Sequence, residues 1–166
     1  AVRQAGGHAG LEAAPIVPVP RDGGLPLSFA QQRLWFLDQL DPGDPAYNIP
    51  SAVRLTGELS PDLLRRILAE VVRRHEALRT VFASREGRPV QVVTERRPEL
   101  PVIDLSDLSD LPEREARARE LALEEARQPF DLARGPLLRS TLLRLGERDH
   151  LLLLTMHHIV SDGWSM

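Results

Sequence analysis

Two adjacent histidines and an aspartate lie close together near the end of the sequence. The stretch HHIVSDGWSM, residues 157–166, contains His157, His158 and Asp162. A neutral histidine can accept a proton near pH 7, because its unperturbed pKa is about 6.5. A neighbouring carboxylate can hold a ring or an arginine in place. These residue types at this spacing are therefore candidates for general-base or substrate-orienting chemistry.

Three other interpretations of the same stretch compete with a catalytic histidine. A metal site is disfavoured, because adjacent histidines on a strand diverge and no further His or Glu lies nearby in the sequence. A serine nucleophile at Ser161 or Ser165 is disfavoured, because neither lies in a nucleophile-elbow pattern. Two histidines satisfied inside the core, with Asp162 as a helix cap, fit the spacing as well as a catalytic base does. The residues alone leave these last two interpretations open.

A strand must position the histidines. HLLLLTMHH, residues 150–158, is nearly all apolar, which is typical of a strand that is covered on both faces. The polar residues follow its carboxyl end, where ligands usually bind in α/β folds. Because side chains alternate along a strand, we expect His157 and His158 to point to opposite faces. Only one of them can face a given cleft.

Three helices are predicted from their caps and their apolar periodicity, at residues 28–40, 60–75 and 111–127. Ser28 and Gln31 are spaced as a capping box requires. The apolar face expected for this first helix consists of Phe29, Ala30, Leu34, Trp35, Leu37 and Leu40. The third helix has only a thin apolar stripe, so it should lie on the surface of a sheet.

Strands are expected at 47–57, 80–84, 89–93, 136–145 and 150–158. Pro50 cannot donate a ladder hydrogen bond, so the first of these should lie at a sheet edge or be irregular. The second and third are separated by Gly87 and Arg88 and should form a hairpin. Helices and strands interleave without strict alternation, which predicts an α/β fold or α+β sandwich with a mixed sheet.

Composition restricts the class of protein. The 166 residues allow one domain with a real core, and 42% hydrophobic and 27% charged residues are ordinary for a globular protein. A net charge of −3 argues against a nucleic-acid surface. The longest apolar run is too short to span a membrane, and no signal-peptide pattern is seen, so we expect a cytoplasmic protein. Without cysteine there is neither a disulfide nor a Cys-type zinc site.

Residues 1–26 have the composition of a linker. They are rich in Gly and Pro, and PIVPVP favours an extended path. We therefore expect a linker over 1–26 and a folded domain over 27–166. A linker at the start implies a further domain upstream.

Four stretches, in order, resemble the signature motifs of condensation domains of nonribosomal peptide synthetases. They are SFAQQRLWFLDQL with YNIP, RHEALRTVF at 74–82, PFDLARGPLLR at 129–139 and MHHIVSDGWSM at 156–166. The last contains a His-His-x-x-x-Asp-Gly motif, whose short form also belongs to chloramphenicol acetyltransferase and related acyltransferases. Together the four stretches are highly specific, and the resemblance covers about residues 15–166.

The resemblance implies a chloramphenicol acetyltransferase-like lobe, with a mixed β-sheet flanked by helices. A complete domain of the family has two lobes with a tunnel between them, so 27–166 would be the amino-terminal lobe and the carboxyl-terminal lobe would be absent. Linker 1–26 would follow a carrier domain. The implied reaction joins a donor acyl or peptidyl thioester to the α-amino group of an acceptor aminoacyl thioester. Upstream and downstream carrier proteins hold both substrates on phosphopantetheine arms, an adenylation domain is adjacent, and the domain binds no cofactor of its own.

The resemblance also implies roles for the residues at the end of the chain. His158 would face the tunnel and accept the amine proton or position the amine. His157 and Asp162 would be architectural, and Gly163 would keep the backbone close to the reacting centre. The site would also be lined by two further residues, Trp164 and Ser165.

The second motif adds two arginines. Arg74 fits a cation at a helix end, whereas Arg79 precedes a strand and is better placed to be buried. A buried arginine needs a carboxylate, for which Asp162, Glu76 or the absent lobe are the expected sources.

The resemblance favours a subtype but keeps alternatives. The residues of the first and last motifs are most like those of domains that join an L-configured donor to an L-acceptor. The alternatives are a non-catalytic condensation-like module that recruits a partner protein, an epimerization-type relative, and an acyltransferase that uses coenzyme A. Because a tunnel needs both lobes, these 166 residues alone should be inactive and should expose apolar surface where the second lobe docks.

Overall fold

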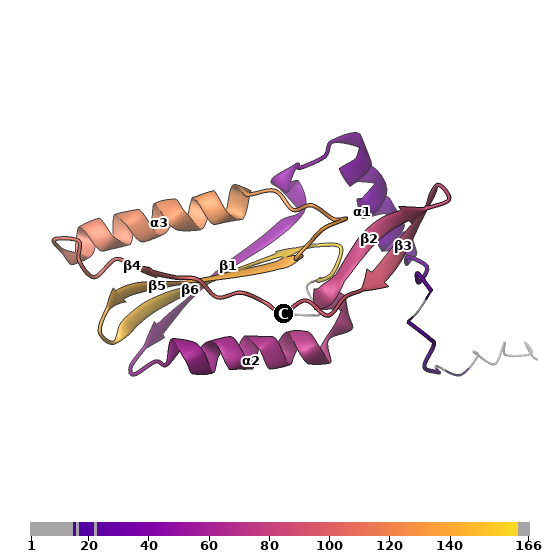
Figure 1. The fold of residues 1–166 in the computed structure, drawn as a ribbon. Coiled ribbons are helices and arrows are strands. Elements are labelled where there is room, and N and C mark those ends of the chain that lie inside the picture. Colours follow the sequence, from indigo (N-terminus) through magenta and orange to yellow (C-terminus); the bar gives the residue numbers. More distant parts are fainter. Residues whose placement is uncertain (1–14, 16, 22, 163–166) are drawn as a thin grey trace, which may run out of the picture.

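A four-stranded mixed sheet forms the centre of the protein (Figure 1). The computed structural model describes residues 15, 17–21 and 23–162. The strands lie in the order β1-β6-β5-β4, with β4 parallel to β5 and the other pairs antiparallel. Their bounds are β1 Asn48–Thr56, β4 Val102–Asp104, β5 Leu138–Gly146 and β6 Asp149–His157. The mixed α/β class predicted from the sequence is confirmed.

Helices cover both faces of this sheet. Helix α3, Leu111–Arg127, lies on one face and α2, Pro61–Arg74, on the other (Figure 1). Along β6 the side chains alternate between them, because Leu153 packs with Ala118 of α3 whereas Leu152 packs with Leu64 and Leu68 of α2. Each fully buried leucine stabilises the fold by about 1.5–3 kcal/mol. The expectations of a strand covered on both faces, and of a third helix on a sheet surface, are therefore confirmed.

Of the two outer strands, one was predicted from the sequence and the other was not. Strand β1 lies at the edge of the sheet, where Pro50 pairs with Thr155, as the missing N–H of proline predicts. Strand β4 was not predicted. It has only three residues, Val102–Asp104, which is too short for an alternating pattern to be visible, and it forms only because β5 offers a parallel partner.

Helix α1, Phe29–Leu40, begins as predicted but packs differently. The Ser28 hydroxyl accepts from the Gln31 N–H, and the Gln31 side chain accepts from the Ser28 N–H. The predicted apolar face is confirmed only in part, because Leu34 and Trp35 pack against a core cluster whereas Phe29 and Leu40 are exposed. Apolar and polar residues are both spread around this helix, so its periodicity could not select the buried side.

A separate hairpin lies beside the sheet. It consists of β2, Thr80–Arg85, and β3, Arg88–Val93, paired antiparallel. The residues before α1 join it, because Leu25 exchanges two backbone hydrogen bonds with Gln91, of 2.9 and 2.8 Å. Beneath the hairpin, Phe82 is buried with the residues that precede β5 and follow β6. Short 3₁₀ helices, η1 Pro45–Tyr47 and η2 Glu76–Arg79, lead into β1 and β2. No helix in the described residues is long and apolar enough to cross a membrane.

Candidate active site

The candidate residues lie where strand β6 ends. Strand β6 ends at His157, one residue earlier than the sequence suggested. The chain turns there, because the Val160 N–H donates to the His157 carbonyl at 3.1 Å. The His158 N–H donates to the Tyr47 carbonyl at 2.9 Å, which ties this turn to the residue before β1. His158 therefore projects from a hydrogen-bonded turn and not from the strand itself.

His157 is enclosed by the fold. It is 3% exposed, and its Nδ1 accepts a hydrogen bond from the Ile159 N–H at 3.1 Å. The Phe130 ring meets it edge-on at 5.9 Å between centroids, and Tyr47 lies at 6.3 Å. Burial, with a smaller contribution from the His158 charge, lowers the pKa of His157 to about 4. The ring is therefore neutral at pH 7 and holds the turn.

His158 is exposed and has a different hydrogen-bond partner. Its Nδ1 lies 2.8 Å from the Ser161 carbonyl oxygen. Because a carbonyl can only accept, Nδ1 carries the proton, and in the neutral ring Nε2 carries the lone pair. This backbone contact thus selects the tautomer in which Nε2 can accept a proton from a bound amine. One ring is buried and the other exposed, as expected, although His158 lies in the turn after β6 and strand alternation is therefore not the cause.

Of the residues that follow the turn, the structure describes Ser161 and Asp162. Asp162 is exposed. Ser161 is 5% exposed, and its hydroxyl has no hydrogen-bond partner among the described residues. The expectations for Gly163, and for the lining residues Trp164 and Ser165, lie outside the described residues.

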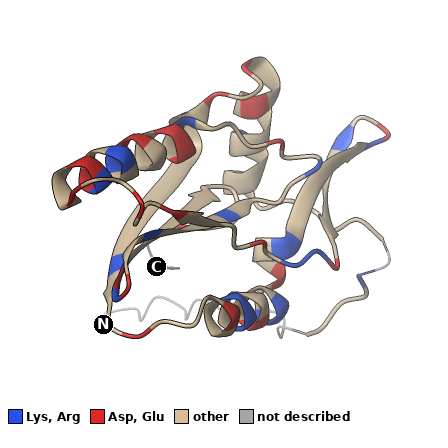
Figure 2. Cartoon of the chain, turned by 60° about the vertical axis from the view of Figure 1, so that its left-hand side comes forward, with Lys and Arg blue, Asp and Glu red and all other residues tan. Residues whose placement is uncertain are grey.

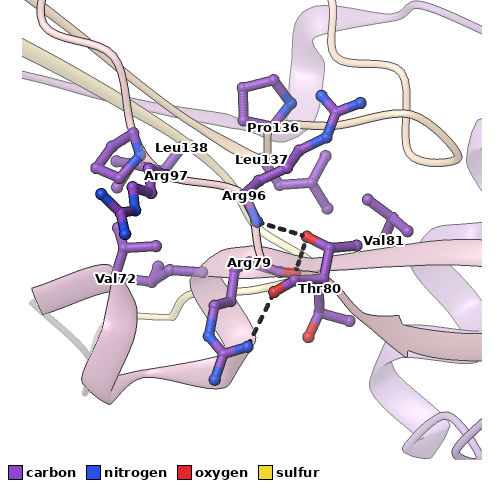
Figure 3. Close-up of a pocket in the computed structure, with 12 residues that line it drawn as sticks. Val72, Arg79, Thr80, Val81, Arg96, Arg97, Pro136, Leu137 and Leu138 are labelled. Atoms are coloured by element: carbon purple, nitrogen blue, oxygen red, sulfur yellow. Dashed lines mark hydrogen bonds between the residues drawn. The ribbon is translucent and has the colours of Figure 1, made fainter. Parts of the chain in front are cut away.

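Arg79 is largely buried at the end of η2 (Figure 3). Its side chain is 14% exposed, and its Nη1 donates to the Thr94 carbonyl at 2.9 Å. Of the expected carboxylate partners, Glu76 lies 3.8 Å from Nη2. Glu95, which was not anticipated, lies 3.3 Å from Nη1. In the described part of the chain, no hydrogen bond or ion pair joins Arg79 to either histidine. Arg74 stays at the surface and pairs with Glu70, as a helix-end cation can.

The pocket beside Arg79 is too small for a substrate. Arg79 and Thr80 line this pocket together with Leu137 and Leu138, where β5 begins (Figure 3). The enclosed volume is about 10 Å³, which is close to the space of one water molecule. Among the described residues, no group of three or more His, Asp or Glu side chains is placed to hold a metal ion.

The groups that hold the histidines were not predicted from the sequence. The carbonyls of Tyr47 and Ser161 act through the backbone, so their side chains carry no signal. Phe130, which packs on His157, lies in the PFDL stretch and could have been suspected from that resemblance.

Comparison with known proteins decides the family. The family model described as "Condensation domain" matches residues 22–166. The chain belongs to the condensation-domain family. It is 52% identical over 161 residues to a linear gramicidin synthase of Brevibacillus parabrevis, covering 96% of this chain and 2% of that protein. It is 46% identical over 165 residues to the phosphinothricin tripeptide synthetase PhsC of Streptomyces viridochromogenes, covering 96% of this chain and 15% of that protein.

A solved condensation domain has the same fold. The starter condensation domain of rhizomide synthetase RzmA superposes with a TM-score of 0.79 at 28% identity, covering 86% of this chain and 34% of that one. The chloramphenicol acetyltransferase-like fold expected from the sequence is thereby confirmed. The chain thus spans about a third of that solved domain and a small part of each synthetase.

Proposed function

We propose that this condensation-family chain is part of a domain that forms amide bonds in a nonribosomal peptide synthetase. The α-amino nitrogen of an acceptor aminoacyl thioester bonds to the carbonyl carbon of a donor acyl or peptidyl thioester. The C–S bond of the donor breaks, its thiol leaves, and the amine proton is transferred away. Support comes from the family match and from relatives that are themselves synthetases.

The single observation that carries the mechanism is the hydrogen bond that orients His158. The Ser161 carbonyl holds the proton on Nδ1, 2.8 Å away, so Nε2 is free to accept. In this proposal His158 takes the proton from the attacking amine or stabilises the amine as it attacks. His157 and Asp162 hold the turn, and Arg79 supports the site from η2. By resemblance, Gly163 lies close to the reacting centre, and the site is lined by Trp164 and Ser165.

The domain organisation belongs to the same proposal. Residues 27–166 form the amino-terminal lobe, 1–26 form the linker after a carrier domain, and the other lobe completes the tunnel. Since one lobe cannot enclose two substrates, residues 1–166 alone should form no amide. Upstream and downstream carrier proteins deliver the substrates on phosphopantetheine arms, an adenylation domain is adjacent, and the domain itself needs no cofactor. The amino-acid sequence of the motifs favours an L-configured donor with an L-configured acceptor.

An assay of the complete condensation domain tests the proposal. Donor and acceptor carriers are loaded, and amide product is followed by mass spectrometry. His158→Ala should lower the rate roughly 100-fold or more, as expected for removal of a general base. His75→Ala is the matched control, because His75 is an exposed histidine after α2, and its rate should equal that of the wild type. Unchanged yield in His158→Ala would contradict the assigned role. Tight partner binding without any condensation would instead favour a recruitment module.

A further inference from the structure

Helix α2 has one wide apolar face, of which the fold buries only one part. Leu64, Leu68 and Val72 are directed toward the sheet and are buried or half-buried. In the neighbouring row of the same face, Leu63, Ile67 and Val71 are 54%, 50% and 40% exposed. Their spacing of four residues places them in one row along the helix. Single exposed apolar side chains are ordinary, but a continuous row of them on a monomer indicates an interaction surface.

This row lines a groove. The α2 groove has a volume of about 840 Å³ and runs between α2 and the segment that follows β3. Its apolar residues are Leu63, Ile67, Ala69 and Val71, and its acidic residues are Glu70 and Glu95. Its arginines are Arg66, Arg73, Arg74, Arg79, Arg96 and Arg97.

The acidic residues of the groove are already engaged. Glu70 contacts Arg73 and Arg74, both at 2.7 Å, and these hydrogen bonds lower its pKa to about 2. Glu95 contacts Arg79 at 3.3 Å. Figure 2 shows arginine and glutamate side by side along α2, the lowest helix in that view.

Two arginines of the groove are unpaired. Within the described residues, neither Arg66 nor Arg97 forms an ion pair or a hydrogen bond through its side chain. The groove is therefore locally positive although the whole sequence has a net charge of −3. A positive rim over an apolar floor requires a partner that is apolar in the middle and negative at its edges.

We propose that the α2 groove docks an acidic amphipathic helix of a partner protein. An apolar row at the same spacing would fill the floor over Leu63, Ile67 and Val71, which is the helix-in-groove mode of recognition. Glutamates beside that row would pair with Arg66 and Arg97, and arginine suits interfaces because its planar group binds carboxylates with two hydrogen bonds. A nucleic acid fits less well, because phosphates cannot cover the aliphatic floor.

Binding of a defined peptide to the complete condensation domain tests this proposal without any condensation assay. The probe is a fluorescent helical peptide of the length of α2, with leucine at every fourth position and glutamate on both flanks. A twin carries lysine in place of glutamate. Fluorescence anisotropy should show binding of the acidic peptide that weakens as salt is added. The lysine twin should bind at least about tenfold more weakly.

Variants locate the site. Arg66→Glu combined with Arg97→Glu should weaken the acidic peptide at least about tenfold, and Ile67→Glu should do the same by disrupting the apolar floor. Arg119→Glu on the exposed side of α3 is the matched control and should bind as the wild type does. Because all four positions are exposed, these variants should fold, which circular dichroism checks.

Three outcomes of the binding measurements would overturn the proposal. The first is equal affinity for the two peptides, and the second is unchanged affinity in the double arginine variant. The third is displacement of the labelled acidic peptide by a DNA duplex as efficiently as by unlabelled acidic peptide. That result would indicate a general polyanion-binding surface. Accessibility is checked separately with Ile67→Cys. Failure of a thiol reagent to label it in the complete domain would show that the rest of the domain covers the groove, and would also refute the proposal.

Discussion

The His158 ring is held by the backbone three residues further on, because its Nδ1 lies 2.8 Å from the carbonyl oxygen of Ser161. A carbonyl accepts a hydrogen bond whatever side chain its residue carries. The tautomer of His158 therefore depends on the shape of the turn and not on the chemistry of the serine side chain. The buried serine hydroxyl is a separate matter, since it has no partner among the described residues.

Replacement of Ser161 separates the role of its carbonyl from that of its hydroxyl. We expect Ser161→Ala to keep the condensation rate of the complete domain, because the carbonyl remains in place. Removal of a buried hydroxyl without a partner should leave stability unchanged or raise it by about 1 kcal/mol. Denaturant unfolding and the condensation assay measure the two effects. A large loss of rate would instead revive the serine as a nucleophile, and Ser51→Ala on β1 serves as a serine control.

Protonation of His157 should make stability depend on pH. Its pKa is about 4 in the fold and about 6.5 in an unfolded chain. Between these values the unfolded chain binds a proton that the folded one does not, so stability falls as pH is lowered from 6.5 to 4. The contribution is up to roughly 3 kcal/mol. Unfolding of the complete domain is compared with His157→Asn at several pH values, and the difference between them should shrink toward pH 4. A constant difference would contradict the assignment.

Arg139 should be a strong contributor to stability. Its Nε contacts Glu125 at 2.7 Å, its Nη2 donates to the Glu125 and Gln128 carbonyls at the end of α3, and its guanidinium lies 3.8 Å from the Phe130 ring centre. Arg139→Ala should cost about 2–4 kcal/mol, because it leaves a largely buried carboxylate unpaired and removes a cation–π contact.

Arg134 provides the control for that substitution. It pairs with Asp131 at 3.7 Å and is 85% exposed, so Arg134→Ala should change stability by less than about 0.5 kcal/mol. Similar midpoints of urea unfolding for the two variants would contradict the importance assigned to Arg139.

Truncation of a leucine on a helix-covered face of the sheet should cost more stability than truncation of a leucine in the α2 groove. Leu142 on β5 is fully buried, and Leu142→Ala should cost about 2–5 kcal/mol because it leaves a cavity. Leu63→Ala, at a half-exposed position, should cost less than about 1 kcal/mol. Thermal unfolding of the complete domain measures both. A cost for Leu63→Ala as large as that for Leu142→Ala would mean that this face is covered.

Local signals in the sequence were sufficient for much of the fold. The capping box of Ser28 and Gln31, the bounds of α3 and the edge position implied by Pro50 all follow from hydrogen-bonding needs of neighbouring residues, and the structure confirms them. The buried side of α1 and the short strand β4 did not follow, because both depend on partners that are distant in the sequence.

The site divides in the same way. The sequence by itself determined which residues are candidates for the chemistry, since the two histidines and the aspartate stand together in one motif. Tertiary structure alone decided the surroundings of each ring. Phe130 and Tyr47 enclose His157 from distant segments and lower its pKa, whereas the turn to Ser161 orients His158 and leaves its Nε2 available. Burial and tautomer depend on contacts across space, and adjacent residues in a sequence do not encode which neighbours will enclose them.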